Sequence, residues 1–116
     1  MGGVLDRIRK VPLIKSSEIV TDGFVTREAD VDFLEGSFSI QFSYEGLSGT
    51  LTSIIEVSVD WINFAEVADT DQVFTDASGS HIYDLSSTGV TLIRVKFTGG
   101  GSMILNDAIL VGSRRH

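Results

Sequence analysis

The sequence contains no cysteine, one proline and one tryptophan, and these shortages exclude several kinds of protein. Without cysteine the chain has neither disulfide bonds nor thiolate ligands for a metal ion. No apolar run approaches the roughly 18 residues of a transmembrane helix. The opening MGGVLDRIRK carries charges where a secretory signal needs an uninterrupted apolar segment, so we expect none. With 116 residues, 42% of them hydrophobic, the chain is expected to bury one core without covalent cross-links.

Basic residues are also missing from the middle of the chain. Between Glu28 and Ile93 there are twelve acidic residues and no Lys or Arg, while both ends carry a basic excess. The net charge of −7 disfavours binding to nucleic acid or to an anionic membrane, so neither is expected as a partner. The basic ends have two interpretations: they contact an acidic surface, such as the body of a neighbouring copy, or they are solvated termini.

Convincing helical periodicity is absent, and apolar residues recur instead at every second position. In the run SFSIQFSYEG, apolar residues alternate with serine and glutamine, which is typical of a strand with one buried face. The buried face of that run is predicted to contain Phe38, Ile40, Phe42 and Tyr44. The next run, TLTSIIEVSVD, is predicted to turn Leu51, Ser53, Ile55, Val57 and Val59 to one face, with Glu56 and Ser58 on the other. Glycines at 46 and 49 make these two runs a hairpin.

Further strands are predicted within 22–33, at QVFTD, HIYDL and TLIRVKFTG, and at SMILNDAILVG. The last of these is either a strand pair or one strand with a bulge around Asn106 and Asp107. Seven or eight strands with turn signals every 8–12 residues predict an all-β antiparallel sandwich or jelly roll over residues 21–116.

Residues 1–20 are predicted to form an N-terminal extension outside the sandwich. Its segment GVLDRIRKVPLIK is basic and partly apolar, which suits an assembly contact on a neighbouring subunit. The apolar side chains expected at that contact are Val4, Leu5, Ile8, Val11, Leu13 and Ile14.

Residues that support catalysis or metal binding are few. A triad of Ser80, His81 and Asp84 can be drawn, but sequence neighbours rarely give that geometry, and no nucleophile-elbow motif is present. Asp69, Asp71 and Asp76 either hold calcium or form a polar loop, although the run lacks the glycine and glutamate of an EF-hand. We therefore predict no enzymatic activity and no cofactor.

Trp61 follows a mostly apolar strand and has two interpretations. If the alternation continues, Val59 and Trp61 point inward, Trp61 closes one end of the core, and Asp60 and Asn63 shape the turn. Alternatively, Trp61 is a stacking platform for a sugar or a partner chain. In the sugar-binding hypothesis, Tyr44 and Tyr83 also stack on the ligand, and hydroxyl groups are bound by Asp60, Asn63 and Asp84.

The run FSIQFSYEGLSGTLTSIIEVSVDWINFAEV and the later run SHIYDLSSTGVTLIRVKFTGGGSMILNDAILVG resemble small virion proteins of tailed bacteriophages. The resemblance lies in a Gly-x-x-Gly-Thr turn, a strand ending in Ser-x-Asp before an aromatic residue, and Ile93-Arg94-Val95 before a glycine-rich turn. It covers residues 24–112 and implies a β-sandwich carried in several copies on a capsid or tail, without catalytic residues. Residues 55–112 also resemble discoidin-like, galactose-binding sandwiches, but the ligand loops of that family have no counterpart here.

Two functions are therefore carried forward. The first is a non-enzymatic virion protein, such as a capsid decoration, head-fibre or tail-associated component, which is located in the virion and contacts its own copies and other virion proteins. The alternative is a carbohydrate-binding module that contacts host glycans through Trp61 and its polar neighbours.

Overall fold

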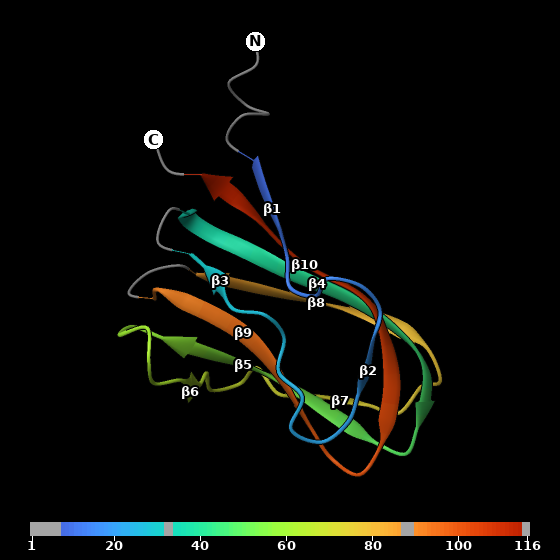
Figure 1. The fold of residues 1–116 in the computed structure, drawn as a ribbon. Helices are drawn as coiled ribbons and strands as arrows, with labels where there is room; N and C mark the ends of the chain where they lie inside the picture. Colours follow the sequence, from blue (N-terminus) through green and yellow to red (C-terminus); the bar gives the residue numbers. More distant parts are fainter. Residues whose placement is uncertain (1–7, 32–33, 87–89, 115–116) are drawn as a thin grey trace.

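The computed structural model describes residues 8–31, 34–86 and 90–114, and in this part of the chain all regular structure is β-strand. No described segment is a helix that could cross a membrane. Ten strands form two antiparallel five-stranded sheets that face each other, so the predicted all-β sandwich is confirmed (Figure 1). The strand number exceeds the predicted seven or eight because several strands have only two or three residues, too few for an alternating pattern.

The first sheet, called sheet A, has the strand order β1-β10-β4-β8, and β2 also pairs with β10. Its strands are β1 (Ile8–Pro12), β2 (Glu18–Val20), β4 (Leu34–Ser48), β8 (Gly79–Ser86) and β10 (Ser102–Arg114). The second sheet, called sheet B, has the order β3-β9-β5-β6, and β7 also pairs with β5. Its strands are β3 (Ala29–Asp30), β5 (Leu51–Ser58), β6 (Ala65–Glu66), β7 (Gln72–Phe74) and β9 (Leu92–Thr98).

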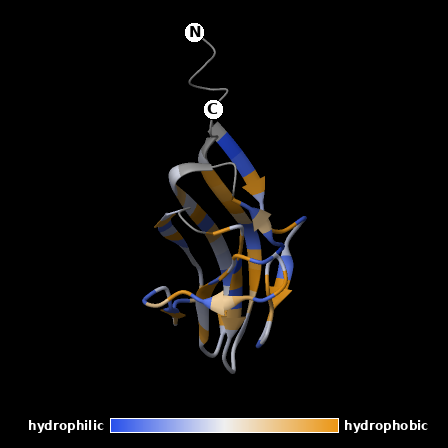
Figure 2. Cartoon of the chain, turned by 90° about the vertical axis from the view of Figure 1, so that its left-hand side faces the viewer, coloured by the Kyte–Doolittle hydropathy of each residue, from blue (hydrophilic) through white to orange (hydrophobic). Residues whose placement is uncertain are grey.

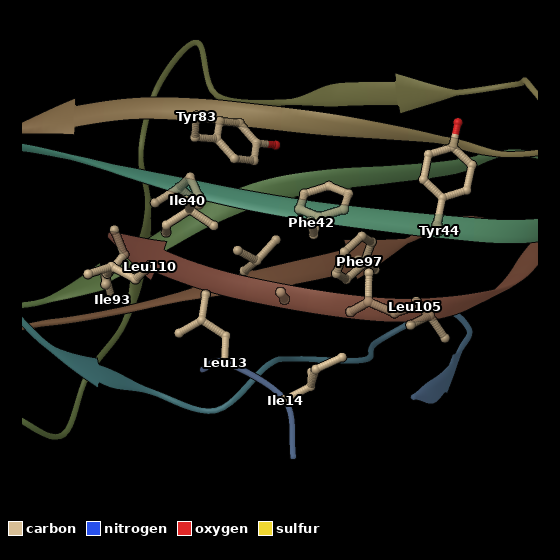
Figure 3. Packing of buried hydrophobic residues seen from close by; sticks show 14 of the residues in the cluster. Leu13, Ile14, Ile40, Phe42, Tyr44, Tyr83, Ile93, Phe97, Leu105 and Leu110 are labelled. Carbon is tan, nitrogen blue, oxygen red and sulfur yellow. The ribbon is translucent and has the colours of Figure 1, made fainter. Parts of the chain in front are cut away.

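The core lies between the sheets and follows the predicted alternation on β4. All four side chains predicted on the buried face of that strand are buried, and Figure 2 shows the alternation of hydropathy along the strands. Phe42 is central, with ring centroids 5.6 Å from Phe74, 5.5 Å from Phe97 and 6.4 Å from Tyr83 (Figure 3). Because Phe42 lies in sheet A and Phe97 in sheet B, these aromatic contacts bind the two layers together.

β10 is one bulged strand, as in the second of its two predicted interpretations. A register shift against β4 falls between Leu105 and Asp107. Met103 and Leu105 are buried before the shift, and Ala108 and Leu110 are buried after it. Odd-numbered residues therefore face the core before the bulge and even-numbered residues face it afterwards, which explains the mixed apolar pattern of this segment.

The predicted domain boundary at residue 20 falls inside the sandwich. β1 pairs with residues 109–113 of β10, and β2 pairs with residues 103–105 of the same strand. Between them Leu13 donates its amide to the Ala108 carbonyl oxygen at 2.8 Å and has 0% of its surface exposed. The described part of the predicted extension therefore completes sheet A, because without it one side of β10 would lack backbone partners.

This placement also changes the predicted assembly contact. Leu13 and Ile14 are buried in the core of their own chain, and Val11 packs against that core, so these three do not form an outward-facing contact. Val4, Leu5 and the side chain of Ile8 lie outside the described residues.

The predicted hairpin of the two runs around Gly46 and Gly49 is wrong, because β4 pairs within sheet A and β5 within sheet B, so the turn between them crosses from one sheet to the other.

The glycine-rich turn between β9 and β10 passes close to the turn between β4 and β5. Gly99 has φ = 126°, and a Cβ there would lie 2.7 Å from the Thr50 carbonyl oxygen. At Gly101 a Cβ would lie 2.5 Å from the Ser48 carbonyl oxygen and 2.7 Å from the Thr50 amide nitrogen. Gly100, between them, has open space on that side. Two of the three glycines are therefore required by close backbone approach.

Gly101→Ala should lower the free energy of unfolding by about 2 kcal/mol or more, because backbone atoms of the neighbouring turn must move. The matched variant Gly100→Ala should change it by less than about 0.5 kcal/mol. Urea denaturation of both variants measures this difference, and equal effects would contradict the close-packing explanation.

Candidate interaction loop at the end of β5

The alternation of β5 ends at Ser58, and the residues that follow face solvent. Val59 is 67% exposed, Trp61 55% and Ile62 79%. This segment, here called the 59–62 loop, follows β5 at the end of sheet B where β5 has its arrowhead in Figure 1. The interpretation that Val59 and Trp61 point inward and that Trp61 closes the core is therefore wrong. The chain leaves the extended conformation there, since Trp61 has φ = 70°.

Asp60 holds the 59–62 loop in this conformation. Its Oδ1 accepts hydrogen bonds from the amides of Ile62 at 2.9 Å and Asn63 at 2.8 Å, and from the Ser58 hydroxyl at 3.0 Å. Its Oδ2 accepts one from Nδ2 of Asn63 at 2.8 Å. The amides of Asn63 and Ile62, followed by the side chains of Asn63 and Ser58, hold the pKa of Asp60 well below its usual range. The prediction that Asp60 and Asn63 shape the turn is confirmed.

Two neighbouring segments anchor the two sides of the loop. On one side, the Thr91 amide donates to the Ser58 carbonyl oxygen at 2.9 Å. On the other, the Arg94 guanidinium lies 3.9 Å from the ring centroid of Phe64, which is a cation–π contact. The loop therefore presents its apolar side chains from a supported backbone.

Two basic residues near the C-terminal end, Arg94 and Lys96, contact an acidic surface of their own chain. Nε of Arg94 lies 2.8 Å from Oε1 of Glu56, and Nζ of Lys96 lies 3.8 Å from Oε2 of the same residue. A weaker contact of 3.6 Å joins Arg94 to Glu28. Two basic residues of the C-terminal segment thus pair with the acidic body of their own chain. Glu56 and Ser58, predicted on the face of the strand opposite Leu51 and Ile55, are buried.

The structure does not gather the residues of the predicted sugar site. Tyr83 is buried, and its hydroxyl lies 2.5 Å from the Ser53 hydroxyl in the core. Burial raises the pKa of Tyr83 to about 12. Asp84 lies on sheet A, where it accepts a hydrogen bond from Ser39 at 2.6 Å, whereas Trp61 follows a strand of sheet B. Tyr44 is also buried.

The polar residues beside Trp61 are occupied as well. Both carboxylate oxygens of Asp60 accept hydrogen bonds within the loop, and the side-chain amide of Asn63 donates to one of them. Trp61 is therefore the member of the predicted set that keeps both exposure and freedom to contact a ligand.

The other candidate sites are also not assembled. The His81 ring lies 4.5 Å from the ring of Tyr83 and 5.9 Å from that of Phe42, whereas Ser80 and Asp84 are exposed on the opposite face of β8. No triad geometry follows from this arrangement. Across residues 8–31, 34–86 and 90–114, no three acidic or histidine side chains are grouped as metal ligands, and this includes Asp69, Asp71 and Asp76.

Sequence reasoning missed the exposure of Val59 and Ile62. The signal was present in Ser58-x-Asp60-x-x-Asn63, because an Asp that caps the amides two and three residues later ends a strand. A turn at Asp60 removes the basis for extending the alternation to Trp61.

No protein-family model matches the chain, and no curated protein matches it by sequence. Among solved structures, the tailspike protein 4 enzymatically active domain of bacteriophage CBA120 is similar over 91% of this chain and 19% of that one, with 16% identity and a TM-score of 0.51. The SPBc2 prophage-derived protein YomS covers 90% and 93% of the two chains at 13% identity and a TM-score of 0.49. TmCBM61, solved with β-1,4-galactotriose, covers 89% and 86% at 17% identity and a TM-score of 0.45. Likeness at these identities concerns the fold alone, and the sandwich implied by both sequence resemblances is confirmed.

Asp60→Ala should increase the mobility of Trp61, because the loop loses the carboxylate that accepts its hydrogen bonds. Since Trp61 is the single tryptophan, its fluorescence anisotropy should fall and acrylamide quenching should rise. Asp107→Ala, an exposed carboxylate on β10, is the matched control. Unchanged anisotropy in Asp60→Ala would contradict the capping role.

Replacing His81 should reduce the acid sensitivity of the fold. Burial lowers the pKa of His81, so below the unfolded pKa of 6.5 the unfolded chain takes up a proton that the folded chain does not. Stability should therefore fall as the pH drops from 6.5 toward the folded pKa. Between about pH 7.5 and about pH 5, His81→Leu should lose less free energy of unfolding than the parent chain in urea titrations. Equal losses would contradict the assignment.

Proposed function

We propose that this chain is a non-enzymatic virion protein that binds a neighbouring virion protein through the 59–62 loop. The observation that carries the proposal is the exposure of Val59, Trp61 and Ile62 together on a loop fixed by Asp60. Adjacent large apolar side chains on a surface loop are typical of a protein interface.

The energetics favour a protein partner. Burying each of these side chains would contribute on the order of 1.5–3 kcal/mol before ordering costs. Those costs are reduced because the Asp60 hydrogen bonds already order the loop. Tryptophan is also among the residues that most often dominate interface affinity.

The placement on a virus particle is supported by the sequence resemblance to small virion proteins, whose fold this chain has. Capsid decoration, a head-fibre role and a tail-associated role all fit a small sandwich that binds a neighbouring protein through the 59–62 loop. A non-enzymatic role is supported by the separation of the candidate catalytic residues, since His81 packs against core aromatics and Asp84 lies on the outer face.

The carbohydrate-binding alternative depends on Trp61 alone. A sugar site needs polar groups that converge beside the aromatic platform. The side chains of Asp60 and Asn63 are instead hydrogen-bonded to each other, and Tyr83 is buried. An apolar loop without free polar neighbours suits an apolar protein surface better than a sugar ring.

The test uses virus particles from the host that produces this chain. An antibody against the chain should detect it in particles purified by density-gradient centrifugation and should label them in electron micrographs. When particles are assembled with the double variant Trp61→Ser, Ile62→Ser as the sole copy, we expect at least a tenfold loss of the chain from particles. Both replaced side chains are exposed, so each substitution should change the free energy of unfolding by less than about 0.5 kcal/mol.

Val73→Ser is the matched control, because Val73 is exposed on β7 and pairs with Thr52 at the opposite end of β5. It should leave the particle content unchanged. Absence of the chain from purified particles would overturn the proposal. Glycan-array binding that is lost in Trp61→Ala would overturn it in favour of the carbohydrate-binding alternative.

A further inference from the structure

The edges of the two sheets differ in how they are protected against pairing with another chain. In sheet B the strands at the margins, β3, β6 and β7, have only two or three residues. In sheet A one margin holds the short β2 and β1, and β1 carries Lys10 and Pro12. Short strands, lysine and proline are the devices by which natural sheets prevent edge-to-edge association.

β8 forms the other margin of sheet A and has none of these devices. It is eight residues long and contains no Lys, Arg or Pro. Its pairing with β4 runs without a register shift from Ser86 opposite Ser37 to Gly79 opposite Tyr44. Within the described ranges, residues 79–85 of β8 have no backbone pairing on the side away from β4.

The outward side chains of β8 are self-complementary. Ile82 is 53% exposed and lies midway between Ser80 and Asp84 on the same face of the strand. When an identical strand is placed antiparallel about a two-fold axis at Ile82, Ile82 faces its own counterpart. Ser80 of each copy then faces Asp84 of the other. The hydrogen bond between Ser39 and Asp84 on adjacent strands shows that this Ser–Asp pairing suits the sheet.

The inward side chains are compatible with the same register. His81 would lie opposite Tyr83 of the second copy, which repeats a contact already present within the chain at 4.5 Å. The pairing would join the five-stranded sheet A of each copy into one continuous ten-stranded sheet. Such a contact is isologous and closed, as in most homodimers.

From these observations we infer that β8 is a self-association edge, at which two copies of this chain pair antiparallel around Ile82. The site lies on sheet A and uses none of the residues of the 59–62 loop. The dimer therefore goes beyond the proposed particle contact, and either can fail without the other.

The first test is charge at the two-fold axis. Ile82→Lys would place two lysines directly opposite each other, which disfavours strand pairing. By sedimentation equilibrium the parent chain should have twice the 12.5 kDa mass of one chain, and Ile82→Lys should have the single-chain mass. Val73→Lys is the matched control because Val73 is 52% exposed and lies on sheet B, and it should remain dimeric. Circular dichroism checks that both variants keep the fold.

The second test is a single introduced thiol, which is unambiguous because the chain contains no cysteine. Residues opposite each other in an antiparallel pair have Cα atoms about 4.5–5.5 Å apart, within disulfide range. Oxidised Ile82→Cys should convert almost completely to a covalent dimer, whereas Val73→Cys should stay mostly monomeric. A parent chain that is monomeric up to about 1 mM would overturn the inference. So would a dimer that survives Ile82→Lys, or equal cross-linking of the two cysteine variants.

Discussion

The burial of every second side chain between two facing sheets is the constraint on which the rest of this structure depends. β4 supplies Phe42 from one layer, and β9 supplies Phe97 from the other, so the rings meet at the centre of the core. Apolar burial of this kind is the main favourable term in folding a chain without disulfides. Polar groups buried between the sheets then need hydrogen-bond partners, and no buried side-chain nitrogen or oxygen atom of the described residues lacks one. The Ser53–Tyr83 hydrogen bond illustrates this requirement, since it links the hydroxyl groups of the two sheets.

The same constraint explains where binding surfaces arise. Alternation holds a side chain inside only while the backbone stays extended, and at Asp60 the backbone turns. Trp61 is then held outward at a positive φ, a conformation with a local cost that the surrounding hydrogen bonds must offset. A loop with exposed aromatic and aliphatic side chains and a fixed backbone suits recognition of another surface better than it suits core packing.

Sheet edges are the second consequence of building a protein from strands alone. Each edge presents backbone groups without sheet partners, and a folded protein must cover, shorten or charge it. The N-terminal segment covers one side of β10, which is why residues 8–20 belong to the sandwich rather than to an appendage. β8 lies at the opposite margin with a regular backbone and an exposed isoleucine, so the two margins of sheet A have different physical characters.

Much of the fold could be predicted from local patterns. The alternation in FSIQFSY, a turn at Gly46 and Gly49, and the bulge near Asn106 all reflect side-chain periodicity or backbone freedom, which nearest neighbours in the chain determine. That the strands on either side of this turn enter different sheets, and do not pair as a hairpin, depends on partners distant in the sequence. Much less of the candidate site could be predicted. Extending the alternation past Ser58 placed Trp61 in the core. Periodicity alone does not reveal that the Asp60 carboxylate accepts hydrogen bonds from two backbone amides and so forms a turn there. Tyr83 and Asp84 are adjacent to each other in sequence, but the strand sends them to opposite faces, one into the core and one to the surface.

The sequence by itself therefore determined the class of structure: strands, their buried faces and the absence of covalent cross-links. Only the tertiary structure decided which strands pair, that β1 and β2 complete sheet A, and that Glu56 is buried beneath Arg94 and Lys96 rather than left in water. The physical reason is the range of the interactions. Periodicity and turn chemistry act over a few residues, whereas strand pairing, edge coverage and ion pairs join residues as far apart as Pro12 and Ile109, whose proximity exists only once the two layers have closed.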